Sequence, residues 1–361
     1  MYFPRTKNEW WFSGTITLQA ALIVILEVFG SFDLLTLNSY ILTQWQSWTL
    51  PHATQVQISY IVPVSLALLI FACIYAAILS LDGIHCKNNI LLFALCGCNV
   101  LILIFSAMQY GQLRDAVNNL PLQRDSHLNP LVKLDMNIWS YIQPAQLAAI
   151  IFIGLCSPIT WVAAYYLHKE YAWALYRQLH GDSSFKIRYL AYEIFLVLIK
   201  LDFFFLVGFI VQYDLVDVHF EEPEYFLTLA LIPVSFIIML MGIWTVRSEW
   251  KIATFSVIVC LILLMAYLLS RIIILCGHTS RANTAGKDTM LLLAITSLVL
   301  TFFTVICVIQ CFFNFGHGLE SIIGNKKQPS RDYGYDSQPI SSSMDGHSLE
   351  FSKPNARLSI E

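Results

Sequence analysis

The chain has 361 residues, of which 57% are hydrophobic and only 12% are charged, with a formal net charge of −3. Soluble domains usually carry about a quarter charged residues, so this composition excludes an ordinary water-soluble globular protein and favours an integral membrane protein. The nearly balanced charge gives no basic surface for nucleic acid, and we expect no nucleic-acid partner.

The apolar residues are grouped into long stretches. A transmembrane helix needs about 20 mainly apolar residues, and eight stretches meet this requirement. They are 14–36, 57–80, 89–110, 145–168, 189–213, 225–246, 252–275 and 289–313. The sequence therefore predicts an all-α polytopic bundle of about eight transmembrane helices over residues 1–317, surrounded by the lipid bilayer.

The composition changes abruptly near residue 318. The segment 318–361 is rich in Ser, Pro, Gly and charged residues and has few apolar residues to bury. Such segments cannot offset the entropy of ordering, so we predict a disordered, Ser-rich cytosolic tail. Two roles remain open for it: a solubilising segment, or a phosphorylated tail that binds cytosolic sorting or trafficking partners.

The distribution of Lys and Arg predicts the orientation. With the N-terminus in the cytosol, nine basic residues of the core lie on the cytosolic side and five lie on the opposite side. The cytosolic nine are Arg5, Lys7, Lys87, Lys169, Arg177, Lys186, Arg188, Arg247 and Lys251, and the other five are Arg114, Arg124, Lys133, Arg281 and Lys287. Because cytosolic loops carry the excess of Lys and Arg, we expect both termini in the cytosol.

Within the fifth stretch, the segment "LVLIKLDFFFLVGF" contains two charged residues, Lys200 and Asp202. A lysine or aspartate at the centre of a membrane helix costs roughly 2.5–3.5 kcal/mol, so each normally has a partner or a wet cavity. A rise of about 1.5 Å per residue puts Lys200 and Asp202 near the midplane of the bilayer, and Glu27 of the first stretch lies at a comparable depth.

The helical period predicts the directions of these side chains. Residues two apart are separated by about 200° around a helix, so Lys200 and Asp202 should face different neighbouring helices. We expect Glu27 to be the partner of Lys200. Glu193 shares the helix face of Lys200 but lies two turns away, near cytosolic water, so we expect its side chain to extend towards that water. The candidate partners of Asp202 are Asn99 and Arg271.

These intramembrane charges allow two interpretations. They form a structural pair that fixes helix packing, or they line a midplane site that carries a proton, an ion or a small solute. The chain contains none of the common hydrolase, nucleotide-binding or zinc-protease motifs, and its histidines show no metal-ligand spacing. We therefore expect no metal, no cofactor and no enzymatic activity.

A weak internal repeat is also present. "IVPVSLALLI" begins at residue 61 and "LIPVSFIIML" at residue 231, which is an offset of 170 residues. One helix earlier, "LIVILEVF" from residue 22 matches "FLVLIKLD" from residue 195, an offset of 173 that aligns Glu27 with Lys200. This pattern indicates either four helices duplicated in the same orientation or a coincidence of apolar composition.

The segment "WALYRQLHGDSSFKIRYLAYEIFLVLIKLDFFFLVGFIVQ" at 173–212 resembles a family of uncharacterised fungal multi-pass membrane proteins of the Golgi apparatus. The resemblance is most specific in "YEIFLVLIKLDFFFLVGF" and implies a Golgi location. It carries no known activity and no functional residues. The expected function is therefore non-catalytic, in membrane trafficking, sorting or organisation, and the alternative is a secondary transporter with a charged midplane site.

Overall fold

The computed structural model describes residues 4–40, 53–119, 139–178, 183–214, 224–277 and 286–315. These residues form eight α-helices, and no strand is found among them. The helices are α1 (Lys7–Tyr40), α2 (Ala53–Cys86), α3 (Asn89–Asn119), α4 (Trp139–Gln178), α5 (Ser183–Tyr213), α6 (Glu224–Arg247), α7 (Lys251–Cys276) and α8 (Lys287–Phe313). Each contains a span long and apolar enough to cross a membrane, which confirms the predicted fold class. The segment 318–361 lies outside the described residues.

Several helices extend beyond their apolar stretches, and α1 shows why. It begins at Lys7, before the predicted start at residue 14, because polar residues cap it. The Thr6 hydroxyl accepts a hydrogen bond from the Glu9 backbone N–H at 3.3 Å, and the Glu9 carboxylate accepts one from the Thr6 N–H at 3.3 Å. This reciprocal capping box satisfies backbone donors that a helix start otherwise leaves open. Hydropathy alone does not detect such a start.

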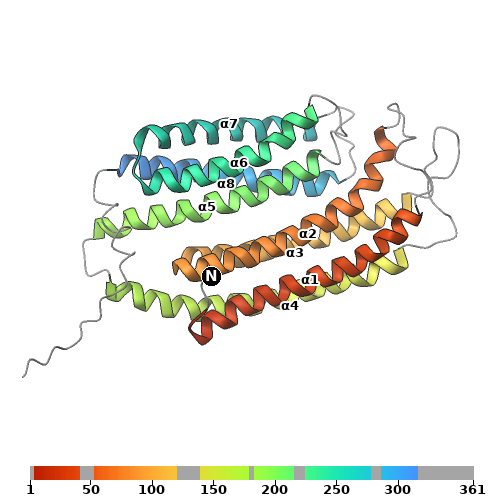
Figure 1. Cartoon of the computed structure of the whole chain (residues 1–361), viewed down its shortest axis with the longest axis horizontal. Coiled ribbons are helices and arrows are strands. Elements are labelled where there is room, and N and C mark those ends of the chain that lie inside the picture. The colour runs from red at the N-terminus through yellow and green to blue at the C-terminus, as the bar shows by residue number, and fades with distance from the viewer. Residues whose placement is uncertain are drawn as a thin grey trace, which may run out of the picture.

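The helices are arranged as two groups of four, α1–α4 and α5–α8, that lie side by side (Figure 1). The contacts within each group form a ring. In the first half, α1 packs on α2 and α4, and α3 closes the ring between them. In the second half, α5 packs on α6 and α8, and α7 closes that ring in the same way. Each half therefore repeats one order of neighbours, with successive helices side by side and the fourth helix returning to the first.

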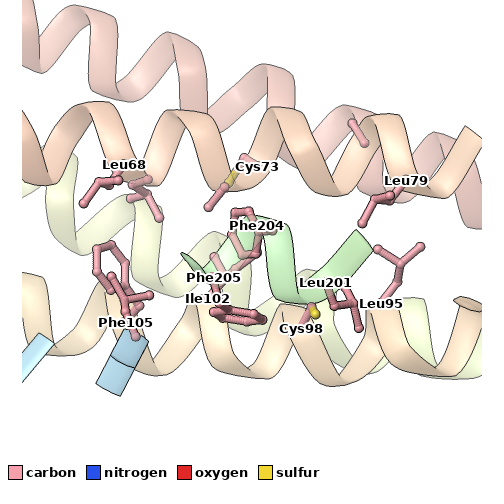
Figure 2. Packing of buried hydrophobic residues seen from close by; sticks show 14 of the residues in the cluster. Leu68, Cys73, Leu79, Leu95, Cys98, Ile102, Phe105, Leu201, Phe204 and Phe205 are labelled. Atoms are coloured by element: carbon pink, nitrogen blue, oxygen red, sulfur yellow. The ribbon is translucent and has the colours of Figure 1, made fainter. Parts of the chain in front are cut away.

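The two halves meet along one side of each ring. Contacts between them run from α2 and α3 of the first half to α5 and α8 of the second. Of the eight spans α5 is the most deeply buried, whereas α6 and α7 are the least. Figure 2 shows the packing at this junction, where Phe204 and Phe205 of α5 lie between Leu68 and Cys73 of α2 and Ile102 and Phe105 of α3. The centre of the molecule is thus apolar and continuous across both halves.

The order of neighbours agrees with a four-plus-four organisation, but the duplication itself stays a prediction. The contact between the halves joins the α2–α3 side of one ring to the α5–α8 side of the other. If α5 and α8 correspond to α1 and α4, the two halves contribute different sides to the junction. Such a contact is heterologous, so the two rings do not meet through a shared two-fold axis.

Candidate functional site

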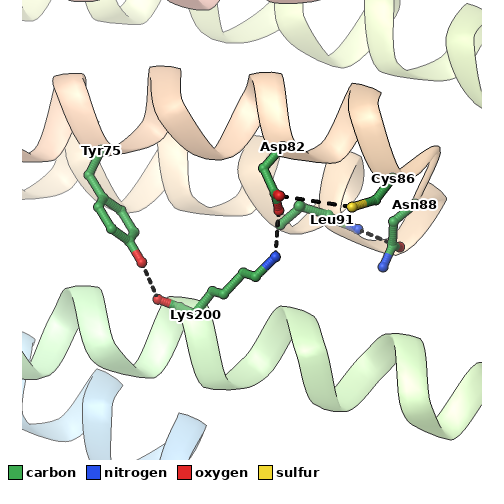
Figure 3. Close-up of polar contacts among 6 residues, drawn as sticks. All are labelled: Tyr75, Asp82, Cys86, Asn88, Leu91 and Lys200. Atoms are coloured by element: carbon green, nitrogen blue, oxygen red, sulfur yellow. Dashed lines mark hydrogen bonds and ion pairs between the residues drawn. The ribbon is translucent and has the colours of Figure 1, made fainter. Parts of the chain in front are cut away.

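Lys200 of α5 forms an ion pair across the junction between the halves. Lys200 Nζ lies 2.5 Å from Asp82 Oδ2 of α2 (Figure 3). Their side chains are 18% and 36% exposed, so the pair is only partly buried. Glu27, the partner expected from depth and from the repeat, hydrogen-bonds elsewhere, and that expectation is wrong.

Helix geometry explains how Lys200 reaches Asp82. Side chains on a helix lean towards its N-terminus, so a long lysine at residue 200 extends back along α5. Asp82 lies one turn before the end of α2, on the side of the bundle where α5 begins. The charged group of Lys200 therefore lies well away from the level of its own Cα, towards the end of the bundle that carries the N-terminus, as expected for snorkelling.

Aromatic residues support the ion pair along the same two helices. The Tyr75 hydroxyl of α2 donates a hydrogen bond of 2.8 Å to the Lys200 backbone carbonyl. The Tyr75 ring also stacks on Phe204, with ring centroids 5.1 Å apart and an interplanar angle of 10°. Phe71 stacks on the same phenylalanine at 5.6 Å. Contacts spaced four residues apart on both helices thus form one continuous stripe between the halves.

Asp202 faces the other way, into the second half. Its Oδ1 accepts hydrogen bonds from the Ser297 hydroxyl at 2.9 Å and from the Thr301 hydroxyl at 2.8 Å, both on α8. The carboxylate is 3% exposed. Lys200 and Asp202 thus contact different helices, as their angular separation predicts. The partners of Asp202 are hydroxyl groups rather than Asn99 or Arg271.

Glu27 is buried inside the first half. It is 1% exposed, and both of its carboxylate oxygens accept from Nε2 of Gln146 on α4, at 3.1 and 2.9 Å. The same two helix positions recur in the second half, where a carboxylate on the first helix, α5, contacts polar residues on the fourth, α8. By these contacts Glu27 corresponds to Asp202, whereas the sequence alignment paired it with Lys200.

The other predicted partners are engaged elsewhere. Asn99 and Gln19 exchange two hydrogen bonds between their side-chain amides, at 2.7 and 3.3 Å. The Arg271 guanidinium donates to the Tyr213 hydroxyl at 3.0 Å and lies over the rings of Tyr213 and Tyr267. These contacts fix α3 against α1 and α7 against α5.

Glu193 also differs from its expected environment. We expected its side chain to extend towards water, but the residue is only 9% exposed. It lies beside Tyr192 in the part of the second half where α5, α7 and α8 pack together. Burial in a helix bundle is therefore not decided by distance from the membrane surface alone.

Sequence reasoning missed Asp82, Gln146, Ser297 and Thr301. Asp82 lies just beyond the predicted second stretch, 57–80, and was therefore counted with the loop that follows. The extension of α2 to Cys86 brings it into the bundle. Neutral Gln, Ser and Thr side chains hardly lower the mean hydropathy of a stretch, so hydropathy does not single them out. Each could have been found as a polar residue on a buried helix face.

Two apolar cavities lie near these contacts, at the junction of the halves. One, of about 340 Å³, lies between α3, α5 and α8, and the other, of about 30 Å³, also touches α2. Among the described residues that line them, none is charged, and Thr296 supplies the one hydroxyl. No group of three or more His, Cys, Asp or Glu that could hold a metal ion occurs in the described part of the chain.

A comparison with known proteins gives one informative relative. A UPF0658 Golgi apparatus membrane protein of the fission yeast Schizosaccharomyces pombe is 26% identical over 272 residues, which cover 72% of this chain and 77% of the relative. The chain is similar to a fungal Golgi membrane protein. This finding confirms the resemblance predicted from the α5 segment. No protein-family model and no solved structure matches the chain.

The similarity covers most of the eight-helix fold. At 272 residues it is too long to rest on the α5 segment alone. The name of the yeast protein gives a location and a membrane association, and it mentions no activity. Any activity of this chain therefore has to be argued from its own residues.

Proposed function

We propose that this chain is a multi-pass protein of the Golgi membrane that acts without catalysis, in membrane trafficking, sorting or organisation. The main support for the proposal is that the charged residues within the membrane do not gather at one site, because each contacts a different helix. Lys200 pairs with Asp82, Asp202 binds α8, and Glu27 binds Gln146. Polar contacts of this kind commonly hold membrane helices together.

Two further observations support this proposal. The two cavities at the junction of the halves have apolar linings in the described residues, so they offer no charged group to a polar substrate. The similarity to the yeast Golgi protein supports the location. We further propose that both termini are cytosolic and that residues 318–361 bind cytosolic trafficking partners.

The proposal is tested by location and by partners in a fungal cell. The full-length protein, tagged at its C-terminus, is expected to coincide with a Golgi marker. Deletion of residues 318–361 is expected to reduce the cytosolic proteins recovered by crosslinking, while the shortened protein stays in the membrane. An unchanged set of crosslinked proteins, or a steady-state location outside the Golgi, would contradict the proposal.

One observation favours a secondary transporter as the second candidate. Glu27 and Asp202 are buried carboxylates within membrane spans, and the described partners of both are neutral polar groups. Intramembrane carboxylates of this type often mark ion or proton pathways. A flux of protons or alkali ions into liposomes that is lost in both Glu27→Gln and Asp202→Asn would favour this function over the first.

A further inference from the structure

A layer of polar side chains crosses the interior of the first half. It consists of Glu27 of α1, Ser65 of α2, Ser106 and Gln109 of α3, and Gln146 of α4. None of these residues is more than 3% exposed. All four helices of the ring contribute to this group, which we call the polar layer.

Two pairs of contacts bring the α1, α3 and α4 members to one level. Gln19 of α1 contacts Asn99 of α3, and these helices run in the same direction. Glu27 lies eight residues beyond Gln19, and Ser106 lies seven beyond Asn99, which is about 12 Å and about 10.5 Å of helix. Glu27 also contacts Gln146 directly, at 2.9 Å.

The antiparallel neighbours of α3 confirm this level. Gln143 of α4 donates to the Tyr110 hydroxyl at 3.4 Å, next to Gln146 on one helix and Gln109 on the other. On the α2 side, Gly83 lies against Leu91, where an added Cβ would lie 3.3 Å from the leucine side chain. Ser65 is eighteen residues before Gly83, and Gln109 is eighteen after Leu91.

The layer residues lie on the faces that point into the ring. On α1, the buried residues Phe12, Ile16, Gln19, Ile23 and Glu27 recur every three or four positions. On α3, the corresponding buried residues are Asn99, Ile102, Ser106, Gln109 and Leu113. Since this spacing marks one face of a helix, Glu27 and Gln109 point into the same interior as the Gln19–Asn99 contact.

Several polar atoms of the layer have no hydrogen-bond partner among the residues that the structure describes. They are Nε2 and Oε1 of Gln109, Oγ of Ser106 and Oε1 of Gln146. Buried polar groups are normally hydrogen-bonded, and leaving them unpaired is unfavourable, especially where lipid surrounds the bundle. Gln212 and Asp214, near the end of α5, also carry buried polar atoms without a partner among the described residues. In the polar layer such atoms lie on both α3 and α4, at the level of the buried Glu27, so this layer is a candidate binding site.

We propose that the polar layer binds one monovalent cation, which is either a proton carried by Glu27 or an alkali metal ion held by Glu27 and neutral oxygens. The layer offers one carboxylate, two amide oxygens and two hydroxyls, and hard oxygen donors of this kind suit such ions. One carboxylate balances a single positive charge. The inference concerns binding within the first half and does not depend on the proposed trafficking role.

The titratable neighbours of Glu27 are few in the described residues. The thiol of Cys73 on α2 lies within electrostatic reach of the carboxylate. The polar-layer residues on α3 and α4 are the neutral Ser106, Gln109 and Gln146. A change of stability that depends on Glu27 is therefore attributable to its own proton or to an ion bound beside it.

The test measures thermal unfolding of the full-length protein in detergent. The temperature of unfolding is followed while Na⁺ replaces choline at constant ionic strength, and separately while the pH is raised in choline. If the layer binds an alkali ion, Na⁺ stabilises the protein, because a ligand that binds only the folded state shifts unfolding. If it binds a proton, Na⁺ has no effect and stability falls as the pH rises, because the folded state holds that proton more tightly.

Two variants and a control identify the site. Glu27→Gln should abolish the Na⁺ dependence, or remove the part of the pH dependence that its own proton contributes. Gln109→Met, which removes the amide at similar size, should weaken the Na⁺ dependence or shift the pH midpoint of that part. Asp202→Asn removes a buried carboxylate outside the layer, so it should leave the Na⁺ dependence unchanged, and Glu27→Gln should still lower the pH dependence in the Asp202→Asn background. If the unaltered protein responds to neither ion, or if Gln109→Met and Asp202→Asn have the same effect, the proposal is wrong.

Discussion

At the scale of single residues, a lysine and an aspartate two positions apart can both lie in one membrane helix because they face different neighbours. Lys200 reaches Asp82 on α2, and Asp202 accepts hydrogen bonds from two hydroxyls of α8. The first contact joins the two halves, whereas the second lies within one half. The same short stretch of α5 therefore contributes to the interface with α2, between the halves, and to the interface with α8, within the second half.

The pair of Lys200 and Asp82 predicts non-additive effects on stability. Exposed ion pairs contribute about 0–1 kcal/mol, whereas removing one partner of a buried pair costs about 3–5 kcal/mol. Because this pair is partly exposed, Lys200→Gln and Asp82→Asn should each lower the free energy of unfolding by about 1–3 kcal/mol. The double variant should lose less than the sum of the two. Thermal or denaturant unfolding of the purified protein measures each value.

A second cycle provides the matched control. Glu27→Gln removes a carboxylate that contacts Gln146 and does not pair with Lys200. Its effect should add to that of Lys200→Gln within about 0.5 kcal/mol, as for independent sites. Strong coupling between residues 27 and 200, with none between 82 and 200, would show that the ion pair has been assigned to the wrong carboxylate.

At the scale of helices, α5 and α6 approach closely at a glycine. A Cβ added at Gly242 would lie 2.6 Å from Cδ1 of Ile199, 3.5 Å from Phe195 of α5 and 3.6 Å from Val257 of α7. Gly97 of α3 is different, since a Cβ added there meets nothing within 4 Å. The absence of a side chain at Gly242 thus allows α6 to lie against both neighbours.

This difference predicts that the same substitution, glycine to alanine, affects stability differently at the two positions. Alanine is favoured over glycine inside a helix by roughly 0.5–1 kcal/mol, so Gly97→Ala should stabilise the protein slightly. Gly242→Ala should lose that gain, and Gly242→Leu should cost about 1–3 kcal/mol through overpacking. Unfolding temperatures of the three variants check the order.

Ile199→Val identifies the clash directly, because it removes the Cδ1 atom nearest to the added carbon. Combined with Gly242→Ala, it should cost less than the sum of the two single changes. Equal effects of Gly97→Ala and Gly242→Ala would show that α6 does not lie this close to α5.

At the scale of the whole molecule, each half is a complete ring of four helices, and the two rings contact each other along one side. The fourth helix of each half packs on the first, and only α2, α3, α5 and α8 contribute the main contacts between halves. Antiparallel four-helix rings with short connections are a common stable arrangement. Each half should therefore fold as a unit and then associate.

Separate expression of the halves tests this arrangement. Fragments 1–180 and 181–361, produced together in one cell, are expected to co-purify. Lys200→Gln in the second fragment should weaken the association about tenfold for each ~1.4 kcal/mol of lost contact. Trp173 is exposed and belongs to α4, a helix outside the main contacts between the halves, so Trp173→Phe is a control with little expected effect. Fragments that insert into the membrane but never associate would contradict the division into halves.

Features that depend on a single segment of the chain could be predicted from the sequence. Helix number and approximate position were predictable because about 20 apolar residues suffice to cross a bilayer. The different directions of Lys200 and Asp202 were predictable because they follow from the helical period. The capping box at Thr6 and Glu9 was readable in principle, as a short local motif.

The partners of the charges were not predictable in the same way. Depth and the internal repeat favoured Glu27 for Lys200, yet the structure pairs this lysine with Asp82, which lies nearer the end of α2. Depth places residues along the membrane normal but does not say which helices are neighbours within the plane. In addition, a lysine side chain is long enough to pair with a carboxylate at a different depth in the membrane.

The sequence by itself therefore determined the class of protein, the helices and the faces on which charged residues lie, because these depend on hydropathy and period within one segment. Tertiary structure alone decided that the helices form two rings, that Lys200 joins them and that five polar residues gather inside the first. Apolar helix surfaces resemble one another in composition, so close packing between particular side chains decides which helices meet.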